Sequence, residues 1–180
     1  EDILAEIFYA FANALSVQKR FELSNLYINF SKYLNSNFKS YDALLAENLL
    51  RLGKKIDSKK KFLKLFEIGS FYKWNSSKEI SLIIEDLEGS EKSLIYLTNI
   101  YKNIDKNLYR TFDYANFLRG HDKFSESITL YSEILSEINK DHKMYPRVLD
   151  RRGTAYERNG EWTLAEKDLL LSLEIDPNQA

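Results

Sequence analysis

Residue types that commonly carry catalysis are scarce in this 180-residue chain. It has no Cys and only two His, His121 and His142, which excludes disulfides, thiolate chemistry and cysteine zinc sites. The phosphate-binding, zinc-binding and nucleophile motifs G-x-x-x-x-G-K-[ST], G-x-G-x-x-G, H-E-x-x-H and G-x-S-x-G are absent. Glu85 and Asp86 are adjacent, so their carboxylates point to different sides of a helix. We expect no catalytic site, no metal and no cofactor, and we expect both His residues to lie in surface loops between helices.

Composition narrows the partners that the chain could have. The net charge is −1, so no overall field favours nucleic acid. Apolar residues make up 44% of the chain, which is ordinary for a globular protein. No apolar run approaches the length of a membrane span, so we expect no direct membrane insertion. These observations argue against nucleic acid as a partner and against a membrane-spanning segment.

The chain is organised around one stretch of 34 residues, 146–179, which reads PRVLDRRGTAYERNGEWTLAEKDLLLSLEIDPNQ. It predicts two amphipathic helices that are joined at Asn159-Gly160. Gly153, Tyr156, Ala165 and Pro177 match the tetratricopeptide repeat (TPR) pattern by type and spacing, and this stretch therefore resembles that family. A similar segment occurs in long TPR arrays of alphaproteobacteria, and this resemblance implies a bacterial source, with the cell envelope or periplasm favoured over the cytoplasm.

Four weaker copies precede this template, so that the expected repeats are 5–38, 39–73, 74–107, 108–145 and 146–179. Two slots hold small residues in every copy: Ala12, Ala46, Ser81, Ala115 and Gly153 in one, and Ser24, Ser58, Ser93, Ser127 and Ala165 in the other. Two further slots hold large apolar residues: Leu15, Leu49, Ile84, Leu118 and Tyr156, and Ile28, Phe62, Leu97, Tyr131 and Leu169. Small residues let antiparallel helices cross closely, and large ones fill the space beside the crossing.

The pattern predicts helices at 2–17, 21–34, 39–52, 57–68, 73–87, 90–104, 108–120, 124–139, 146–159 and 162–174. Gly53, Gly120 and Gly160 fit as stops after the first helix of a pair. About four extra residues near 139–142 predict either a longer loop or a longer second helix. We expect an all-α, right-handed superhelical solenoid of about five TPR-like antiparallel helix pairs, forming a single array that is a fragment of a longer one.

The resemblance implies that the first helices of successive repeats line a concave groove that holds a peptide or a partner helix. Transferred to this chain, the groove positions give a candidate patch with aromatic and basic side chains, a typical composition for binding hot spots. The candidate partner-binding residues are Lys78, Tyr109, Phe112, Asn116, Arg119, Arg147, Arg151 and Arg158.

Two other interpretations apply to the same positions. Some TPR proteins grip a C-terminal carboxylate with five side chains, and the matching residues here would be Lys78, Leu82, Asp113, Arg147 and Arg151. Leu82 cannot form the required hydrogen bond and Asp113 has the wrong charge, which argues against such a clamp. Alternatively, Asp113 and Arg151 simply pair across adjacent first helices.

Charged residues raise two further questions. Arg152 occupies a slot where the repeat has a core Leu; we expect its stem to cover the core while the guanidinium reaches water, although Glu166 or Asp168 could be its partner. Six Lys in 54–64 and the acidic residues of 79–91 are expected to form solvated faces on neighbouring repeats that partly compensate each other. The alternative for the Lys cluster is an anionic partner or a membrane surface.

Taken together, these patterns predict a non-catalytic scaffold for protein–protein interaction that binds a peptide or a partner protein on its concave face. Two alternatives remain open. The chain could be the regulatory arm of a larger enzyme whose catalytic domain lies outside it, or a self-assembly module that stacks through the exposed end of the array after Pro177.

Overall fold

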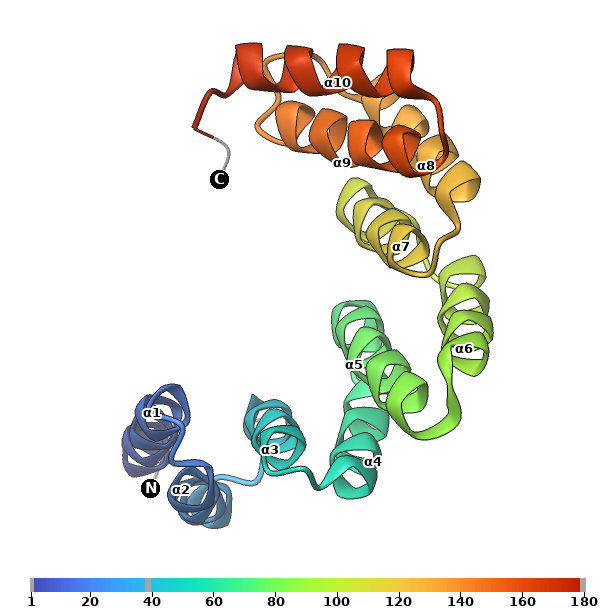
Figure 1. Cartoon of the computed structure of the whole chain (residues 1–180). Helices are drawn as coiled ribbons and strands as arrows, with labels where there is room; N and C mark the ends of the chain where they lie inside the picture. Colours follow the sequence, from blue (N-terminus) through green and yellow to red (C-terminus); the bar gives the residue numbers. More distant parts are fainter. Residues whose placement is uncertain (1, 38–39, 179–180) are drawn as a thin grey trace. The chain divides into compact units, whose positions relative to one another are not determined.

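The computed structural model describes residues 2–37 and 40–178. Within them the chain forms ten α-helices and no strand (Figure 1). The helices are α1 (Asp2–Val17), α2 (Phe21–Leu34), α3 (Ser40–Arg51), α4 (Lys55–Phe66), α5 (Ser70–Glu88), α6 (Ser90–Lys102), α7 (Leu108–Gly120), α8 (Phe124–Glu137), α9 (Tyr145–Arg158) and α10 (Trp162–Ile175). The all-α prediction is therefore confirmed.

The helices divide into two compact units, unit 1 (Glu1–Lys102) and unit 2 (Asn103–Ala180). Unit 1 holds the pairs α1–α2, α3–α4 and α5–α6, and unit 2 holds α7–α8 and α9–α10. In each pair we call the earlier helix the first helix and the later one the second helix. The expectation of a single continuous array stays a prediction, as does the handedness of the superhelix. The predicted repeat boundaries at 38, 39 and 179 lie outside the described residues.

One turn geometry recurs between the two helices of four pairs. The backbone N–H of Arg20, Lys54, Lys123 or Glu161 donates to the carbonyl five residues earlier, at 2.9 Å in each case. The accepting residues are Leu15, Leu49, Leu118 and Tyr156, which are four members of one predicted large apolar slot. Hydrogen bonds of this span close a Schellman-type helix end. The sequence slot therefore marks a backbone acceptor as well as an apolar side chain.

This turn needs a left-handed residue two positions after the first helix ends. Gly53 (φ 73°) and Gly160 (φ 83°) supply it in two pairs, as predicted. Helix α7 ends at Gly120, as predicted, but here Asp122 (φ 57°) and not the glycine takes the left-handed position. Asp tolerates this conformation better than most side chains, so the turn forms without a glycine at that position.

The pair α5–α6 departs from this pattern. Helix α5 begins at Ser70, three residues before the predicted start, and runs for 19 residues. A single residue, Gly89 (φ 97°), separates it from α6. Helices α4 and α5 are the two whose bounds differ most from the prediction. Further along, α8 ends at Glu137, so the extra residues near 139–142 form a loop and not a longer helix.

All ten residues of the two predicted small slots are buried, which confirms the close helix crossing. In three pairs the second-helix Ser also donates a hydrogen bond to the first-helix residue twelve positions earlier. Ser24 Oγ reaches the Ala12 carbonyl at 2.7 Å, and Ser58 and Ser93 reach those of Ala46 and Ser81 at 2.8 Å. The sequence pattern identifies these Ser residues by size alone. Their hydroxyls also join the paired helices.

Candidate functional site

The candidate aromatic–basic residues of unit 2 lie on its two first helices, α7 and α9, which contact each other. Tyr109 is 55% exposed near the start of α7. Phe112, one turn further on, is only 4% exposed, because its ring packs in the unit 2 core against Tyr131 with a centroid distance of 6.0 Å. Phe112 therefore belongs to the core beneath the candidate residues, and almost none of its ring is accessible to a partner.

Arg147 connects this buried ring to the surface. Its guanidinium carbon lies 5.2 Å from the centroid of the Phe112 ring, while the residue as a whole is exposed. A cation over an aromatic face is attracted by the ring quadrupole. Because the ring is fixed in the core, this contact holds the arginine in place at the surface of α9.

Asn116 and Arg119 take part in a network inside unit 2. Asn116 Nδ2 donates to the Phe112 carbonyl, and its Oδ1 accepts from the Tyr131 hydroxyl, both at 2.9 Å. Burial raises the pKa of Tyr131 to about 12, and the charge and hydrogen bond of Arg119 oppose that rise only in part. These two predicted contact residues are thus partly engaged with the core. Only the exposed parts of the Asn116 and Arg119 side chains are accessible to a partner.

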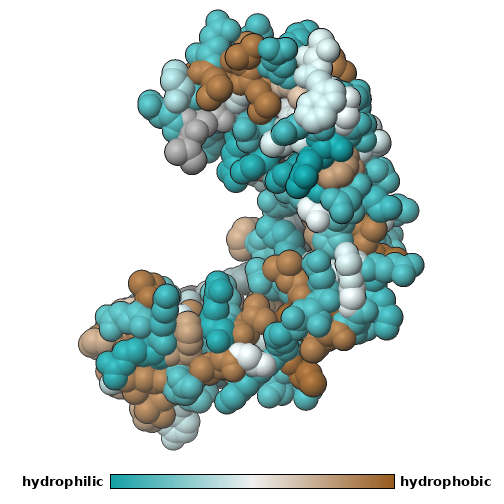
Figure 2. All heavy atoms as spheres, in the orientation of Figure 1, coloured by the Kyte–Doolittle hydropathy of each residue, from teal (hydrophilic) through white to brown (hydrophobic). Residues whose placement is uncertain are grey.

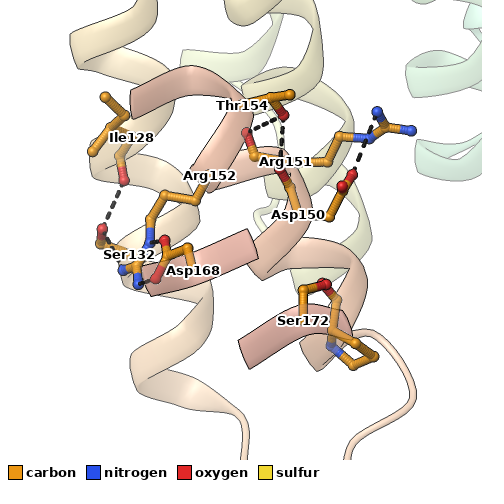
Figure 3. A network of polar contacts seen from close by, with 9 residues as sticks. Ile128, Ser132, Asp150, Arg151, Arg152, Thr154, Asp168 and Ser172 are labelled. Atoms are coloured by element: carbon orange, nitrogen blue, oxygen red, sulfur yellow. Dashed lines mark hydrogen bonds and ion pairs between the residues drawn. The ribbon is translucent and has the colours of Figure 1, made fainter. Parts of the chain in front are cut away.

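Arg151 and Arg152 are neighbours in sequence but leave α9 on opposite sides (Figure 3). Arg151 turns toward the side that carries Asp150, whose Oδ2 lies 3.7 Å from Arg151 Nη1. Thr154 Oγ1 donates to the carbonyl of Asp150 at 2.7 Å. The predicted pairing of Arg151 with Asp113 stays a prediction.

Arg152 is held inside unit 2, so the expectation that its guanidinium reaches water is wrong. Its Nε and Nη2 donate to the two carboxylate oxygens of Asp168 at 2.6 and 2.9 Å (Figure 3). Nη1 donates to Ser132 Oγ on α8 at 3.0 Å. Burial lowers the pKa of Arg152, but the hydrogen bonds and charge of Asp168 outweigh this effect and the pKa is raised. The predicted alternative, a carboxylate of the same repeat, is confirmed.

Lys78 lies on α5 in unit 1, half-buried, whereas the other candidate residues lie in unit 2. The five positions of the carboxylate clamp are divided in the same way, with Lys78 and Leu82 in unit 1. The clamp remains untested, and the objection from the aliphatic Leu82 stands.

The two charged segments of unit 1 compensate each other, as predicted. Lys55 of α4 forms an ion pair with Asp86 of α5, and Lys59 Nζ lies 3.2 Å from Glu88 Oε1. Glu88 also receives Lys92 at 3.5 Å. Three of the six Lys, at residues 60, 61 and 64, do not take part in these ion pairs with α5 and α6.

Unit 1 has an open cavity that is bordered mainly by residues of its first helices α1 and α3. A volume of about 610 Å³ lies between the end of α1 and helix α3, bordered by Asn13, Glu47 and Arg51. Burial raises the pKa of Glu47, the charge of Glu79 adds to the rise, and Arg51 opposes it. This cavity is a second candidate site, in addition to the aromatic–basic residues of unit 2.

A buried asparagine at the bottom of that cavity is not predicted by the sequence pattern. Asn48 is fully buried and donates to Ser24 Oγ at 2.8 Å and to Asn25 Oδ1 at 2.9 Å, while its own Oδ1 accepts from Ser16 at 2.6 Å. Satisfied in this way, a buried amide fixes the register of its neighbours. The only signal in the sequence is a polar residue between Glu47 and Leu49, which a helical surface would equally allow.

The remaining site predictions concern metal and histidine. Among residues 2–37 and 40–178, no three His, Asp or Glu side chains come together as a metal site would require. His121 follows α7, and its ring packs on Phe117 at a centroid distance of 4.1 Å. His142 lies in the loop before α9, where its Nδ1 accepts from the Met144 N–H at 3.2 Å. No helix of the described residues has both the length and the apolar character for crossing a membrane.

Comparison with known proteins identifies solved structures that have a similar fold. No family model and no curated protein matches the chain, but solved structures do. YrrB, a TPR protein with an unusual peptide-binding site, superposes over 96% of this chain and 86% of its own with a TM-score of 0.59 at 14% identity. TTC0263, a TPR protein of Thermus thermophilus, gives a TM-score of 0.65 at 12% identity over 97% and 93%.

MamA of Desulfovibrio magneticus RS-1 is similar to the same degree, with a TM-score of 0.65 at 11% identity over 97% of this chain and 96% of that one. At such identities the likeness concerns the backbone arrangement alone. The chain therefore has the helical-repeat fold of TPR proteins, as its small and large slots predicted.

Proposed function

We propose that this chain is a non-catalytic scaffold that binds another protein, and that unit 2 takes an acidic peptide segment on the face formed by α7 and α9. We define the basic face as Tyr109, Arg147, Arg151 and Arg158. The observation that carries the proposal is the contact of the exposed Arg147 with the buried Phe112 ring at 5.2 Å. A fixed, exposed arginine loses little conformational freedom when a carboxylate binds to it.

The spacing on α9 supports the same conclusion. Residues 147, 151 and 158 differ by four and seven positions, so that they share one side of the helix. From first to last they span about 16 Å at 1.5 Å per residue. An extended peptide of about five residues covers this length. The partner would therefore present several acidic side chains in a short extended segment, with an apolar group near Tyr109.

A titration with a fluorescein-labelled acidic octapeptide, measured by fluorescence polarisation, tests this proposal. We expect Arg147→Ala together with Arg151→Ala to weaken binding about tenfold or more, and added salt to weaken the wild-type complex. Lys167→Ala is the control, because it removes an exposed positive charge of unit 2 that belongs to α10 and not to α7 or α9. An affinity of the double variant within twofold of wild type would rule out the basic face.

A second candidate function is self-association through α10. This helix exposes large apolar side chains, with Trp162 67%, Leu170 60% and Leu173 52% exposed. Exposed apolar surface of this kind commonly marks a contact between proteins. Sedimentation at several protein concentrations tests it: concentration-dependent growth in mass that Leu170→Glu with Leu173→Glu abolishes would support stacking, and a constant monomer mass would exclude it.

A further inference from the structure

A second open recess lies in unit 1, on the side of its second helices. Helices α2 and α4 lie on one side of this unit, with α3 set between them on the other side (Figure 1). The recess between these three helices has a volume of about 660 Å³. Its lining comes from both second helices and from α3, so it is separate from the cavity on the first helices and from the basic face of unit 2.

The lining of this recess combines apolar and basic side chains. Leu45 and Leu49 of α3 and Leu63 of α4 provide apolar lining, and Leu63 is 46% exposed. Lys60, Lys61 and Lys64 provide the basic lining on α4. We refer to this surface as the lysine groove.

The lysines of the groove keep charge available for a partner. Lys64 is exposed and has no ion-pair partner in the described part of the chain. Lys60 Nζ lies 3.6 Å from Asp57 Oδ1, and both side chains are well exposed, at 70% and 63%. An ion pair exposed to this degree contributes little free energy, so Lys60 can exchange Asp57 for another carboxylate at low cost.

Lys61 is available for a different reason. It lies 3.4 Å from Asp42, but Asp42 also receives Lys32 at 2.8 Å. Burial raises the pKa of Asp42, yet Lys32 and Lys61 together lower it further, so the net pKa is below its ordinary value. Because Lys32 alone keeps Asp42 paired, Lys61 can pair with a carboxylate of a ligand in the groove without leaving Asp42 unpaired. Three lysines thus oppose one exposed acid, Asp57.

We propose that the lysine groove binds an acidic amphipathic helix of a partner protein. The three lysines favour a ligand with carboxylates that can pair with them. The leucine lining favours a ligand that also has an apolar face. A helix laid into a hydrophobic groove presents side chains at i, i+3, i+4 and i+7. Helices α2 and α4 have 14 and 12 residues, so a ligand helix of about three to four turns matches their length.

The shape of the groove argues against a lipid surface as the ligand. Leu45 and Leu49 belong to α3, which is set between α2 and α4, and both are only partly exposed, so a flat bilayer could touch the lysines of α4 without reaching these two leucines. A helix about 10 Å across has a convex surface, which can reach into a recess between α2 and α4 where a flat surface cannot. Asn25 and Asn29 of α2 complete the opposite wall, where their amides can hydrogen-bond polar side chains at the edge of the ligand helix.

The test uses a labelled synthetic 14-residue helical peptide with Leu at i, i+3, i+7 and i+10 and Glu at the flanking positions, titrated by fluorescence polarisation. We expect saturable binding that Lys60→Glu with Lys64→Glu weakens about tenfold or more, and that Leu63→Asp also weakens. Lys140→Glu with Lys143→Glu, in the exposed loop before α9, imposes the same change of charge elsewhere and should leave the affinity within twofold.

A charge swap makes the test specific. A peptide in which Lys replaces Glu should bind the Lys60→Glu, Lys64→Glu variant better than wild type. The proposal is overturned if the acidic peptide shows no saturable binding, or if the lysine variants leave its affinity unchanged. It is also overturned, in favour of a membrane surface, if phosphatidylserine vesicles bind with this lysine dependence and the peptide does not. Loss of the unit 2 basic face affects none of these results.

Discussion

Arg152 and Asp168 form a bidentate ion pair in unit 2, with N–O distances of 2.6 and 2.9 Å and side chains that are 19% and 6% exposed. The pair joins the first helix α9 to its own second helix α10, and a third hydrogen bond from Arg152 to Ser132 extends it to α8 (Figure 3). A position where the repeat ordinarily has a leucine therefore connects three helices through polar contacts.

Removing the carboxylate should destabilise unit 2 strongly. Asp168→Ala leaves the buried Arg152 without its counter-charge, and we expect the free energy of unfolding to fall by about 2–4 kcal/mol. Urea unfolding followed by circular dichroism measures this change. The double variant Arg152→Leu with Asp168→Ala should recover most of the loss, because it removes the uncompensated charge. A double variant no more stable than Asp168→Ala would show that the ion pair is not the cause.

The serine contacts between paired helices predict a smaller, repeated effect. Ser58→Ala removes the bond to the Ala46 carbonyl, and Ser93→Ala removes the bond to the Ser81 carbonyl. Each change should lower the free energy of unfolding by about 1 kcal/mol, because a buried carbonyl loses its side-chain donor. Ser36→Ala, at an exposed position after α2, serves as the control and should be neutral in the same urea experiment.

Gly153 should not tolerate a methyl group. A Cβ at this position would lie 2.8 Å from Leu169 Cγ and 3.3 Å from the Ala165 carbonyl oxygen, so Gly153→Ala should cost about 1–3 kcal/mol through overpacking. Gly120→Ala is the matched control, because nothing lies within 4 Å of its Cβ position and its φ is not left-handed. Thermal unfolding compares the two. An equal effect of both substitutions would contradict the close approach of α9 and α10.

Tyr131 predicts a loss of stability in alkaline solution. Burial raises the pKa of Tyr131 to about 12 in the folded chain, whereas an unfolded tyrosine titrates near 10. Between these values only the unfolded state has lost the proton, so the stabilising contribution is complete below about pH 10 and is lost as the pH rises to about 12. The expected loss is about 3 kcal/mol, because one pKa unit corresponds to about 1.4 kcal/mol.

Urea midpoints of wild type and Tyr131→Phe at about pH 9 and about pH 11.5 separate this effect from the titration of other groups. The wild type should lose more stability between the two pH values than the variant does. Equal losses would mean that Tyr131 ionises as an exposed tyrosine does.

Exposed apolar residues on α1 and α2 predict an aggregation-prone end of unit 1. Figure 2 shows hydrophobic side chains gathered at the end of this unit where α1 and α2 lie. Ile3, Phe11 and Phe30 are 75%, 56% and 47% exposed. Phe11→Ser with Phe30→Ser should raise the solubility limit and reduce binding of a hydrophobic dye, since it removes part of this patch. Thr163→Ser, a mild change at an exposed position of α10, is the control; unchanged dye binding in the double variant would contradict the prediction.

The helical pairs could be predicted from the repeat pattern alone. Small residues such as Ala12 and Ser24 recur at fixed spacing because two helices cannot cross closely unless both are small there, and this requirement is visible residue by residue. Helices α1 and α2 accordingly begin and end where the pattern predicts. The pattern also predicts that the lysines of α4 and the acids of α5 compensate each other, because the segments belong to neighbouring repeats.

The use of individual side chains, in contrast, depends on tertiary packing. The sequence predicts that Phe112 contacts a partner and that Arg152 reaches water, but Phe112 is buried and Arg152 is paired with Asp168. Both outcomes depend on the particular side chains that the neighbouring helices bring against these two residues, and the repeat pattern gives only the size expected at each slot and not those partners. The same limit applies to the lysine groove, whose leucine and lysine residues come from α3 and α4 and meet Asn25 and Asn29 of α2 only after the three helices pack.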